Sequence, residues 1–312
     1  MNILILAGAG FIGTNLTIKL AQDKNNQITV VDTNDSFFTN IREKGFSNVK
    51  FKTAALDIDE DFETLLYNQD VVYHLVSTTV PGTSNQKITQ ELMSNVVFTS
   101  KLLDACVKMN IQKVIFLSSG GTVYGKENKC PLKEKTPTNP ISSYGVQKVT
   151  IEKLLYLYRY LHGLDYRIIR LANPYGPYQR PNGMLGAVTT FTYKALKDEE
   201  IIVYGDGSVV RDYIFIDDAI RAIIKIADGE NRHRTFNLGC GYGVSIKELI
   251  TAIQNVLGKE LKINYQSGRK VDVPVNYLDI TRYEKYFGSL NPISLEKGIR
   301  LTADFMTNYY SL

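Results

Sequence analysis

The chain has 312 residues, of which 44% are hydrophobic and 22% are charged, and its formal net charge is +4 at pH 7. This is the composition of an ordinary globular protein, and the length permits one large domain or two smaller ones. Because the net charge is small and no block of Lys and Arg occurs, we expect neither nucleic acid nor a membrane as partner. A modest positive balance still suits an anionic small substrate.

The sequence carries no signal for a metal site, a disulfide framework or a targeting segment. The N-terminus enters an apolar run directly, without a basic region or cleavage site, and no apolar stretch approaches the length of a membrane span. We therefore expect a cytoplasmic protein. The cysteines and histidines are scattered without metal-ligand spacing: Cys106, Cys130, Cys240, His74, His162 and His233.

The first motif is a glycine-rich turn between an apolar strand, Ile3 to Leu6, and a helix predicted over Thr14 to Leu20. In a Gly-x-Gly-x-x-Gly turn, the first glycine permits the tight bend and the second lets the backbone approach a pyrophosphate. The third lets helix and strand pack closely, with the phosphates at the helix N-terminus. The predicted cofactor-binding residues of this turn are Gly8, Gly10, Phe11, Ile12 and Gly13.

An acidic residue follows the second predicted strand. Gln27 to Val31 is β-rich and ends in Asp32, about 20 residues after Gly13. A carboxylate there accepts hydrogen bonds from both adenosine ribose hydroxyls and repels a 2′-phosphate, so we predict NAD and not NADP as the cofactor. A plain glycine turn with a solvated Asp is the alternative, and it is less favoured because strand, turn and acid occur in order.

The next two strands are predicted at Val49 to Phe51 and at Asp70 to Leu75. Asp57 and Ile58 follow the first of them after a short connection, where a carboxylate could read an adenine edge. The Ser-, Thr-, Gly- and Pro-rich loop 76–85 leaves the carboxyl end of the second, where parallel sheets bind ligands. His74 lies within the apolar run, so we interpret it as a buried strand-end histidine.

Residues 88–109 have the period of one continuous helix. Its predicted apolar face holds Leu92, Val96, Thr99, Leu103 and Val107. Asn95 lies in the same helix, where it either braces neighbouring loops by side-chain hydrogen bonds or is exposed. Because short apolar strands alternate with helices, we predict a parallel, doubly wound sheet.

A strand at Val114 to Leu117, a small-residue turn over 118–125 and the stretch 142–148 follow. In that stretch Tyr144 and Lys148 are four residues apart, so a helix places phenol and ammonium on one face. A nearby buried cation favours the phenolate, which can act as a general base toward a sugar hydroxyl. Taken alone the spacing is weak evidence, because the chain holds twenty tyrosines.

The second half has a mixed pattern of short elements. We predict a capping box at Ser245 and Glu248 and one compact unit in which the C-terminal part folds against the sheet. Strands are predicted at 166–171, 201–204 and 235–238, helices at 184–196 and 217–227, a loop at 172–177, a turn at 205–208 and a β-rich run at 209–216.

With these motifs in order, nearly the whole chain resembles the extended short-chain dehydrogenase/reductase family, and within it the sugar-nucleotide epimerases and dehydratases. The closest resemblance is to the UDP-glucose 4-epimerases. It includes the segments 173–177, 205–213 and 267–274, which are similar to the family's nucleotide-sugar contacts and more specific than a glycine motif.

The resemblance implies a role for each matching position. Asn173 would hydrogen-bond the diphosphate-sugar, Arg211 and Arg269 would pair with the diphosphate, and Asp272 would accept from the ribose. Tyr204 falls where the family stacks an aromatic ring on uracil. Guanidinium groups suit phosphate oxygens and a planar ring suits a base. A surface ion pair between Arg211 and its neighbour Asp212 is the alternative for that arginine.

One position departs from the family pattern. The Ser or Thr that shares the O4 hydrogen bond in the family aligns with Gly120, so Ser119 and Thr122 are the candidate substitutes for the missing hydroxyl. The acids that dehydratases and decarboxylases carry at Gly121 and Thr122 are absent as well. Elimination of water therefore lacks its general acid and base.

The implied fold is α/β: a Rossmann-type doubly wound parallel sheet with a smaller mixed α/β C-terminal substrate-binding region. The expected domains are an NAD-binding domain at 1–174, to which 212–238 returns, and a UDP-sugar-binding region at 175–312. The helices near 92–107 and 151–161 could pair as a four-helix bundle in a homodimer, by analogy with the family.

The sequence thus predicts an NAD-dependent epimerase that inverts C4 of a UDP-hexose through a transient 4-keto sugar, with Tyr144 as base. Two other substrates stay open. Arg180 could pair with the carboxylate of UDP-glucuronate, and the moderate size of Asn276 leaves UDP-N-acetylglucosamine open. A non-catalytic NAD-binding regulator is the alternative of another class, which the intact Tyr144 and Lys148 disfavour.

Overall fold

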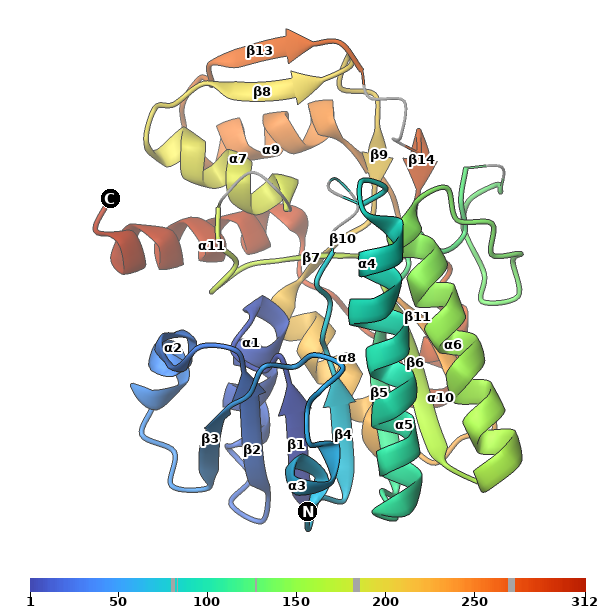
Figure 1. The fold of residues 1–312 in the computed structure, drawn as a ribbon. Coiled ribbons are helices and arrows are strands. Elements are labelled where there is room, and N and C mark those ends of the chain that lie inside the picture. Colours follow the sequence, from blue (N-terminus) through green and yellow to red (C-terminus); the bar gives the residue numbers. More distant parts are fainter. Residues whose placement is uncertain (80–81, 83, 127, 182–185, 269–272) are drawn as a thin grey trace. The chain divides into compact units, whose positions relative to one another are not determined.

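The computed structural model describes residues 1–79, 82, 84–126, 128–181, 186–268 and 273–312 (Figure 1). The chain divides into two compact units that interleave along the sequence. Unit 1 consists of Met1–Ser118, Ser142–Ile169 and Ile226–Thr235, and unit 2 of Ser119–Ile141, Arg170–Lys225 and Phe236–Leu312. The assignment of NAD to 1–174 and of the UDP-sugar to 175–312 stays a prediction.

The main sheet has seven strands in the order β11-β6-β5-β4-β1-β2-β3. They are β1 (Asn2–Leu6), β2 (Gln27–Asp32), β3 (Val49–Thr53), β4 (Val71–His74), β5 (Lys113–Ser119), β6 (Asp165–Leu171) and β11 (Thr235–Leu238). β1 pairs in parallel with both β2 and β4, so the strand order reverses between β1 and β4. The predicted doubly wound sheet is confirmed, and sheets of this kind bind ligands at the carboxyl ends of the strands where the order reverses.

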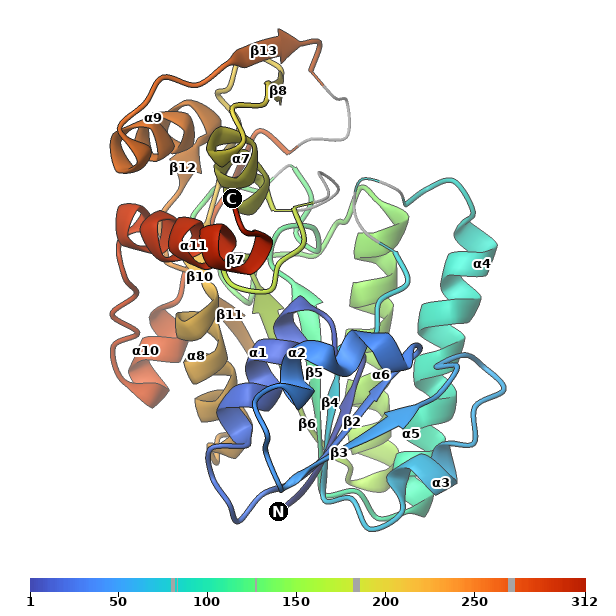
Figure 2. The ribbon, with the colours of Figure 1, turned by 90° about the vertical axis from the view of Figure 1, so that its left-hand side faces the viewer.

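The helices of unit 1 pack on both faces of the sheet, as Figure 2 shows for α1 on one face and α5 and α6 on the other. Leu4 and Leu6 of β1 lie in one buried cluster with Phe98 of α5 and Ile151 of α6. The elements are α1 (Phe11–Leu20), η1 (Asp35–Phe38), α2 (Thr39–Arg42), α3 (Phe62–Leu66), α4 (Ile88–Leu92), η2 (Met93–Val97), α5 (Phe98–Lys108) and α6 (Ser143–His162).

The helix predicted over 88–109 is interrupted. Met93–Val97 forms a π turn between α4 and α5, and such a turn holds one residue more than an α turn. The extra residue shifts the buried face, which in α5 includes Phe98 and Leu102 in addition to Thr99 and Leu103. The prediction of one continuous α-helix was therefore wrong, whereas Val96, Thr99, Leu103 and Val107 do lie toward the core as predicted.

Unit 2 is built from short elements of both kinds. β7 (Asn173–Tyr175) pairs with β10 (Tyr213–Phe215), β8 (Ile201–Tyr204) pairs with β13 (Ile263–Gln266), and β9 (Val210–Arg211) lies between β12 (Val244–Ser245) and β14 (Val275–Asn276). The helices are α7 (Ala187–Leu196), α9 (Ile246–Leu257), α10 (Thr281–Phe287) and α11 (Leu295–Tyr310), while α8 (Ile216–Asp228) continues from unit 2 into unit 1.

Two local predictions for unit 2 have clear outcomes. The capping box is confirmed, because Ser245 Oγ accepts from the Glu248 amide at 3.1 Å and the Glu248 carboxylate accepts from the Ser245 amide at 2.7 Å. The loop predicted at 172–177 instead contains β7, whose Asn173 lies opposite Tyr213 in a parallel register. Among the described residues, no helix has the length and apolarity that crossing a membrane requires.

Candidate active site

The glycine turn after β1 leaves space at one position and none at two others. A Cβ atom on Gly8 would lie 2.7 Å from Val30 Cγ1, and one on Gly13 would lie 2.6 Å from the Gly8 backbone. At Gly10 the nearest atom would be 3.5 Å away. Gly8 and Gly13 are therefore required by packing, whereas Gly10 keeps the N-terminus of α1 open to an approaching group. Phe11 and Ile12 supply the first amides of that helix.

Asp32 ends β2 beside this turn and is 8% exposed. Its Oδ2 accepts from the Ala9 amide at 2.9 Å, and its Oδ1 accepts from the Thr33 amide at 2.8 Å. Each carboxylate oxygen keeps acceptor capacity after one such bond. An open helix N-terminus and an oriented carboxylate fit the pyrophosphate and the adenosine ribose of a dinucleotide.

Asp57 and Ile58 lie in the connection after β3. Asp57 is exposed and accepts from the Asp59 amide at 2.9 Å. Ile58 packs partly buried against the core of unit 1, and its carbonyl accepts from Lys101 Nζ at 2.6 Å. The proposed adenine contact therefore has an accessible carboxylate beside an anchored backbone.

Asn95 is buried, and it braces the loop after β4. Its Oδ1 accepts from the Thr78 amide at 3.0 Å, and its Nδ2 donates to Thr78 Oγ1 at 2.8 Å and to the Glu91 carbonyl at 3.0 Å. Of the two interpretations open for this residue, loop bracing is the observed one. His74 is buried as expected, lies 2.8 Å from Thr99 Oγ1, and has its pKa lowered by burial to about 3.

Tyr144 and Lys148 lie in the first two turns of α6, whose N-cap Ser142 accepts from the Gly145 amide at 3.2 Å. Lys148 Nζ is 5.5 Å from the centroid of the Tyr144 ring, so the predicted shared face is observed. The phenol is half-buried, whereas Lys148 is only 6% exposed.

The Lys148 ammonium is held inside unit 1. Nζ donates to the Leu117 carbonyl at 2.9 Å and lies 4.8 Å from the centroid of the Phe116 ring. Burial lowers the pKa of Lys148 to about 8, although the carboxylate of Glu152, one turn later on α6, acts in the opposite direction. A buried cation with so few partners is suited to interact with a charged or polar group brought to it.

The turn after β5 begins unit 2 and holds the three positions around the missing hydroxyl. A Cβ on Gly120 would lie 2.5 Å from Leu278 Cδ1 and 3.1 Å from the Arg170 carbonyl, so the glycine is required by packing. Thr122 Oγ1 is buried and has no hydrogen-bond partner in the described structure. The Ser119 carbonyl accepts a hydrogen bond from the Val123 amide at 3.3 Å.

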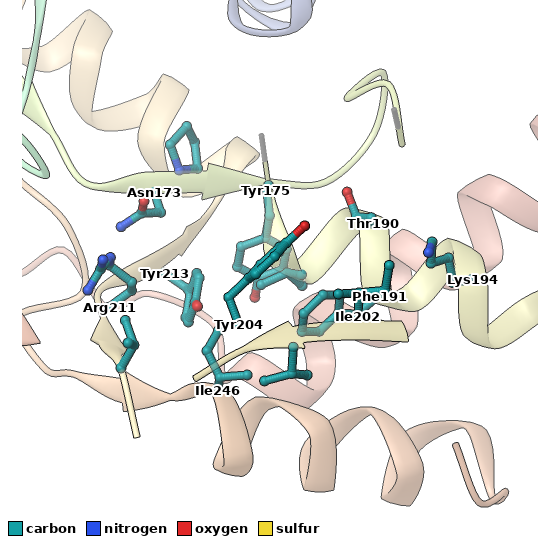
Figure 3. Close-up of a pocket in the computed structure, with 16 residues that line it drawn as sticks. Asn173, Tyr175, Thr190, Phe191, Lys194, Ile202, Tyr204, Arg211, Tyr213 and Ile246 are labelled. Carbon is teal, nitrogen blue, oxygen red and sulfur yellow. The ribbon is translucent and has the colours of Figure 1, made fainter. Parts of the chain in front are cut away.

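Unit 2 contains a cavity of about 380 Å³ that Asn173, Tyr204 and Arg211 line together. Figure 3 shows Asn173 and Arg211 on one side of it, Lys194 on the opposite side, and the rings of Tyr204 and Phe191 between them. Asn173 Nδ2 donates to the Asp212 carbonyl at 2.9 Å, and Arg211 Nη1 donates to the Val273 carbonyl at 2.6 Å. Tyr204 is 37% exposed.

Two predicted substrate residues, Asn276 and Arg180, do not line this cavity. Asn276 is 1% exposed, and its Nδ2 donates to the Gly120 carbonyl at 3.3 Å, while its Oδ1 is buried without a partner in the described residues. Arg180 is exposed and lies near enough to Tyr310 to influence the pKa of that phenol. Arg269 and Asp272 lie outside the described residues.

Sequence reasoning missed several residues that line the cavity, among them Tyr213, Thr190 and Lys194. Tyr213 is 6% exposed, and its hydroxyl has no partner in the described chain. A signal for it was present, because residues two apart in an extended run share a face, which pairs Tyr213 with Arg211. No sequence signal marked Thr190 and Lys194 beyond their four-residue spacing on α7. The described residues contain no cluster of acids, histidines and cysteines suited to a metal ion.

Comparisons with known proteins place this geometry in context. The model of the NAD dependent epimerase/dehydratase family matches residues 3–239. The UDP-glucose 4-epimerase of Mycolicibacterium smegmatis is 33% identical over 311 residues, which cover 99% of each chain.

Two solved structures are similar over almost the whole chain. The UDP-glucose 4-epimerase of Thermotoga maritima, solved with UDP-glucose, has a TM-score of 0.91 and 32% identity, covering 99% of this chain and 100% of that one. The UDP-glucuronic acid 4-epimerase of Bacillus cereus, solved with UDP-glucuronic acid and NAD, has a TM-score of 0.88 and 27% identity, with the same coverage.

Proposed function

The chain belongs to the NAD-dependent epimerase/dehydratase family, as an enzyme of the nucleotide-sugar 4-epimerase kind, and from this premise we propose that it interconverts UDP-glucose and UDP-galactose. The observation that carries the proposal is the pairing of Tyr144 with the buried Lys148 on α6. This pairing supports Tyr144 as a general base, and the turn after β5 carries no acid that would divert the reaction to dehydration.

The cofactor is NAD. The residues that would hold it are the glycine turn, through Gly10 and the first amides of α1, and Asp32 through the adenosine ribose. When bound, NAD would supply the hydride acceptor and donor for C4 of the sugar, so no net cofactor would be consumed. Lys148 would interact with the nicotinamide ribose and with Tyr144 at once.

Tyr144 takes the O4 proton in the proposed mechanism and gives it back after the sugar has turned. The Lys148 ammonium favours the ionised phenol by its charge, which acts strongly because the group is buried. A second hydroxyl is proposed at Thr122 in preference to Ser119, because Thr122 Oγ1 is buried without a partner and so has its hydrogen-bonding capacity available.

The cavity of unit 2 is the proposed site of the UDP group. Arg211 presents guanidinium donors for the diphosphate, Asn173 adds an amide, and Tyr204 offers a ring for uracil. Arg269 and Asp272 remain proposed contacts of the diphosphate and the ribose. The protein holds the diphosphate while the sugar rotates, so its contribution is positioning and electrostatics.

The direct test is incubation of the purified protein with UDP-glucose, UDP-N-acetylglucosamine and UDP-glucuronate separately, without added reductant, and resolution of the products. We expect UDP-galactose from UDP-glucose. Exclusive turnover of UDP-glucuronate would favour the assignment of Arg180 to its carboxylate and would refute UDP-glucose as the substrate. Bound NAD without product from any of the three would favour the non-catalytic regulator.

We also propose a homodimer. Tyr156 (62% exposed), Tyr160 (77%) and Leu161 (58%) are exposed near the end of α6, and Ile88 (51%) and Met93 (42%) are exposed on α4 and η2. Burial of such side chains between two copies is favourable, and a two-fold axis pairs like with like. Light scattering should give a dimer that Tyr160→Glu shifts to a monomer, and a wild-type monomer at all concentrations would refute the proposal.

A further inference from the structure

A buried hydrogen-bond network joins α4 to the first turn of α6. Glu91 of α4 is 6% exposed, and its Oε2 accepts from Ser143 Oγ at 2.5 Å and from Gln147 Nε2 at 3.1 Å. Gln147 Nε2 also donates to Ser143 Oγ at 2.9 Å. Ser143 and Gln147 are 6% and 2% exposed, so the three side chains satisfy one another away from water.

The two partners of Glu91 precede the two proposed active-site residues by one position each. Ser143 precedes Tyr144, and Gln147 precedes Lys148, so both pairs repeat at four residues along α6. Successive residues on a helix differ in direction by about 100°. One edge of the helix is therefore fixed by Glu91 while the adjacent edge presents the phenol and the ammonium.

Glu91 is a buried carboxylate beside the N-terminal turn of α6. It accepts hydrogen bonds from Ser143 and Gln147, and the positive end of the α6 dipole favours an acidic side chain at this place. The same turn is held a second time, because the Ser143 amide donates to Asn85 Oδ1 at 2.7 Å. Asn95 in turn fixes the Glu91 carbonyl.

The geometry points to Glu91 as a positioning residue that sets the placement of Tyr144 and Lys148 through Ser143 and Gln147. This inference rests on the proposed function, because it gives Glu91 an effect on turnover only if Tyr144 and Lys148 carry the reaction. No contact between Glu91 and the substrate is part of the proposal. Its effect is on the rate of the proton step and not on the affinity for the UDP group.

The test compares Glu91→Ala with Glu91→Gln in the full-length protein. Alanine leaves the Ser143 hydroxyl without its acceptor and removes one of the two acceptors of Gln147 Nε2. A shift of the turn by about 1 Å can cost on the order of 10²-fold in rate. We expect kcat to fall by about 10- to 100-fold, with KM for the UDP-sugar changed less than about twofold. Glutamine keeps one acceptor oxygen, and we expect it to restore most of kcat, leaving a loss below about tenfold.

Gln147→Leu provides a check on the route. If Glu91 acts through Gln147, the double variant Glu91→Ala/Gln147→Leu should lose no more than Glu91→Ala alone, because the two residues share one interaction. A loss equal to the product of the two single losses would overturn the shared route.

A structural control separates positioning from general destabilisation. Asn48 is 5% exposed, and its Nδ2 donates to the carbonyls of Ala21, Asp23 and Asn26 in the same unit. Asn48→Ala should lower the melting temperature without changing kcat. Hydrogen exchange should show faster exchange of the amides of residues 142–150 in Glu91→Ala, and unchanged exchange there in Asn48→Ala.

Two outcomes would overturn the inference. One is wild-type kcat and wild-type exchange of 142–150 in Glu91→Ala, and the other is an equal loss of kcat in Asn48→Ala at equal melting temperature. A fully active Tyr144→Phe measured alongside would refute the proposed function instead, so the two failures are distinguishable.

Discussion

The first turns of α6 in unit 1 and the cavity of unit 2 hold their proposed functional groups in different ways. Around α6, Ser143, Gln147 and Lys148 are almost fully buried, and each is hydrogen-bonded by a neighbouring element. In the cavity, Tyr204 is partly exposed and the Tyr213 hydroxyl has no partner in the described residues. The surroundings of the proposed base are thus fixed in advance by protein contacts, whereas part of the proposed recognition site keeps hydrogen-bonding capacity for a ligand.

The largest effect is expected from removal of the proposed base in the first turns of α6. Tyr144→Phe keeps the ring but deletes the hydroxyl, so kcat should fall by about 10²–10⁴, as for a lost general base. The KM for the UDP-sugar should stay near that of the wild type, because the cavity is untouched. Steady-state kinetics with product separation measures kcat and KM. A rise in KM without loss of kcat would contradict the different roles proposed for α6 and for the cavity.

The second effect is a pH dependence of stability that the buried Lys148 produces. Its pKa is lowered from 10.5 to about 8 in the folded state, so between these values the unfolded chain binds more protons at this site than the folded one. Stability should therefore rise with pH across this window, by a contribution on the order of 3 kcal/mol from this site. Urea unfolding at pH 7.5 to 10 measures the rise, and Lys148→Met should remove this contribution.

The third effect belongs to the cavity. Arg211→Ala should raise the KM for the UDP-sugar by an amount equivalent to about 1.5–3 kcal/mol, the value of a charged hydrogen bond, while NAD stays bound. Asp32→Ala is the matched control, because it should weaken NAD by roughly 1–3 kcal/mol and leave UDP affinity unchanged. Calorimetric titrations of both variants with UDP and with NAD test these expectations. Weaker NAD binding in Arg211→Ala together with weaker UDP binding in Asp32→Ala would show that the two residues are assigned to the wrong ligands.

The smallest effect concerns the turn where the usual hydroxyl is missing. Gly120→Ser should destabilise the protein by about 1–3 kcal/mol, because the new Cβ meets Leu278 Cδ1. The companion change Leu278→Ala makes room for it. The double variant should then be more stable than the sum of the single losses predicts, as a double-mutant cycle in urea would measure. Strict additivity would show that Leu278 does not occupy that space.

Much of the fold was readable from local sequence, because the signals were local. Strand, glycine turn and Asp32 occur within one stretch, and Ser245 and Glu248 carry both halves of their capping box. Tyr144 and Lys148 were predictable as a pair because four residues make one helix turn. Each of these needs only neighbours in the chain.

Other features depend on residues that are distant in sequence. No sequence pattern near Gly120 predicts that Leu278 fills its surroundings. Likewise, no pattern near Glu91 predicts Ser143 as its hydrogen-bond partner. α11 was not predicted although its signal was present, since Ser294 caps it and Ile299, Ala303 and Met306 are buried along one face. The lining of the cavity required tertiary structure, because α7, β8 and β9 each contribute to it.

The π turn at Met93–Val97 makes the stretch before α5 sensitive to length more than to composition. Removing one residue from it would restore ordinary α-helical winding and rotate everything upstream by about 100° relative to α5. Glu91 would keep its identity but lose its direction toward Ser143. A single-residue deletion in this turn should therefore break the contact between Glu91 of α4 and Ser143 of α6, whereas most point substitutions in the turn should preserve it.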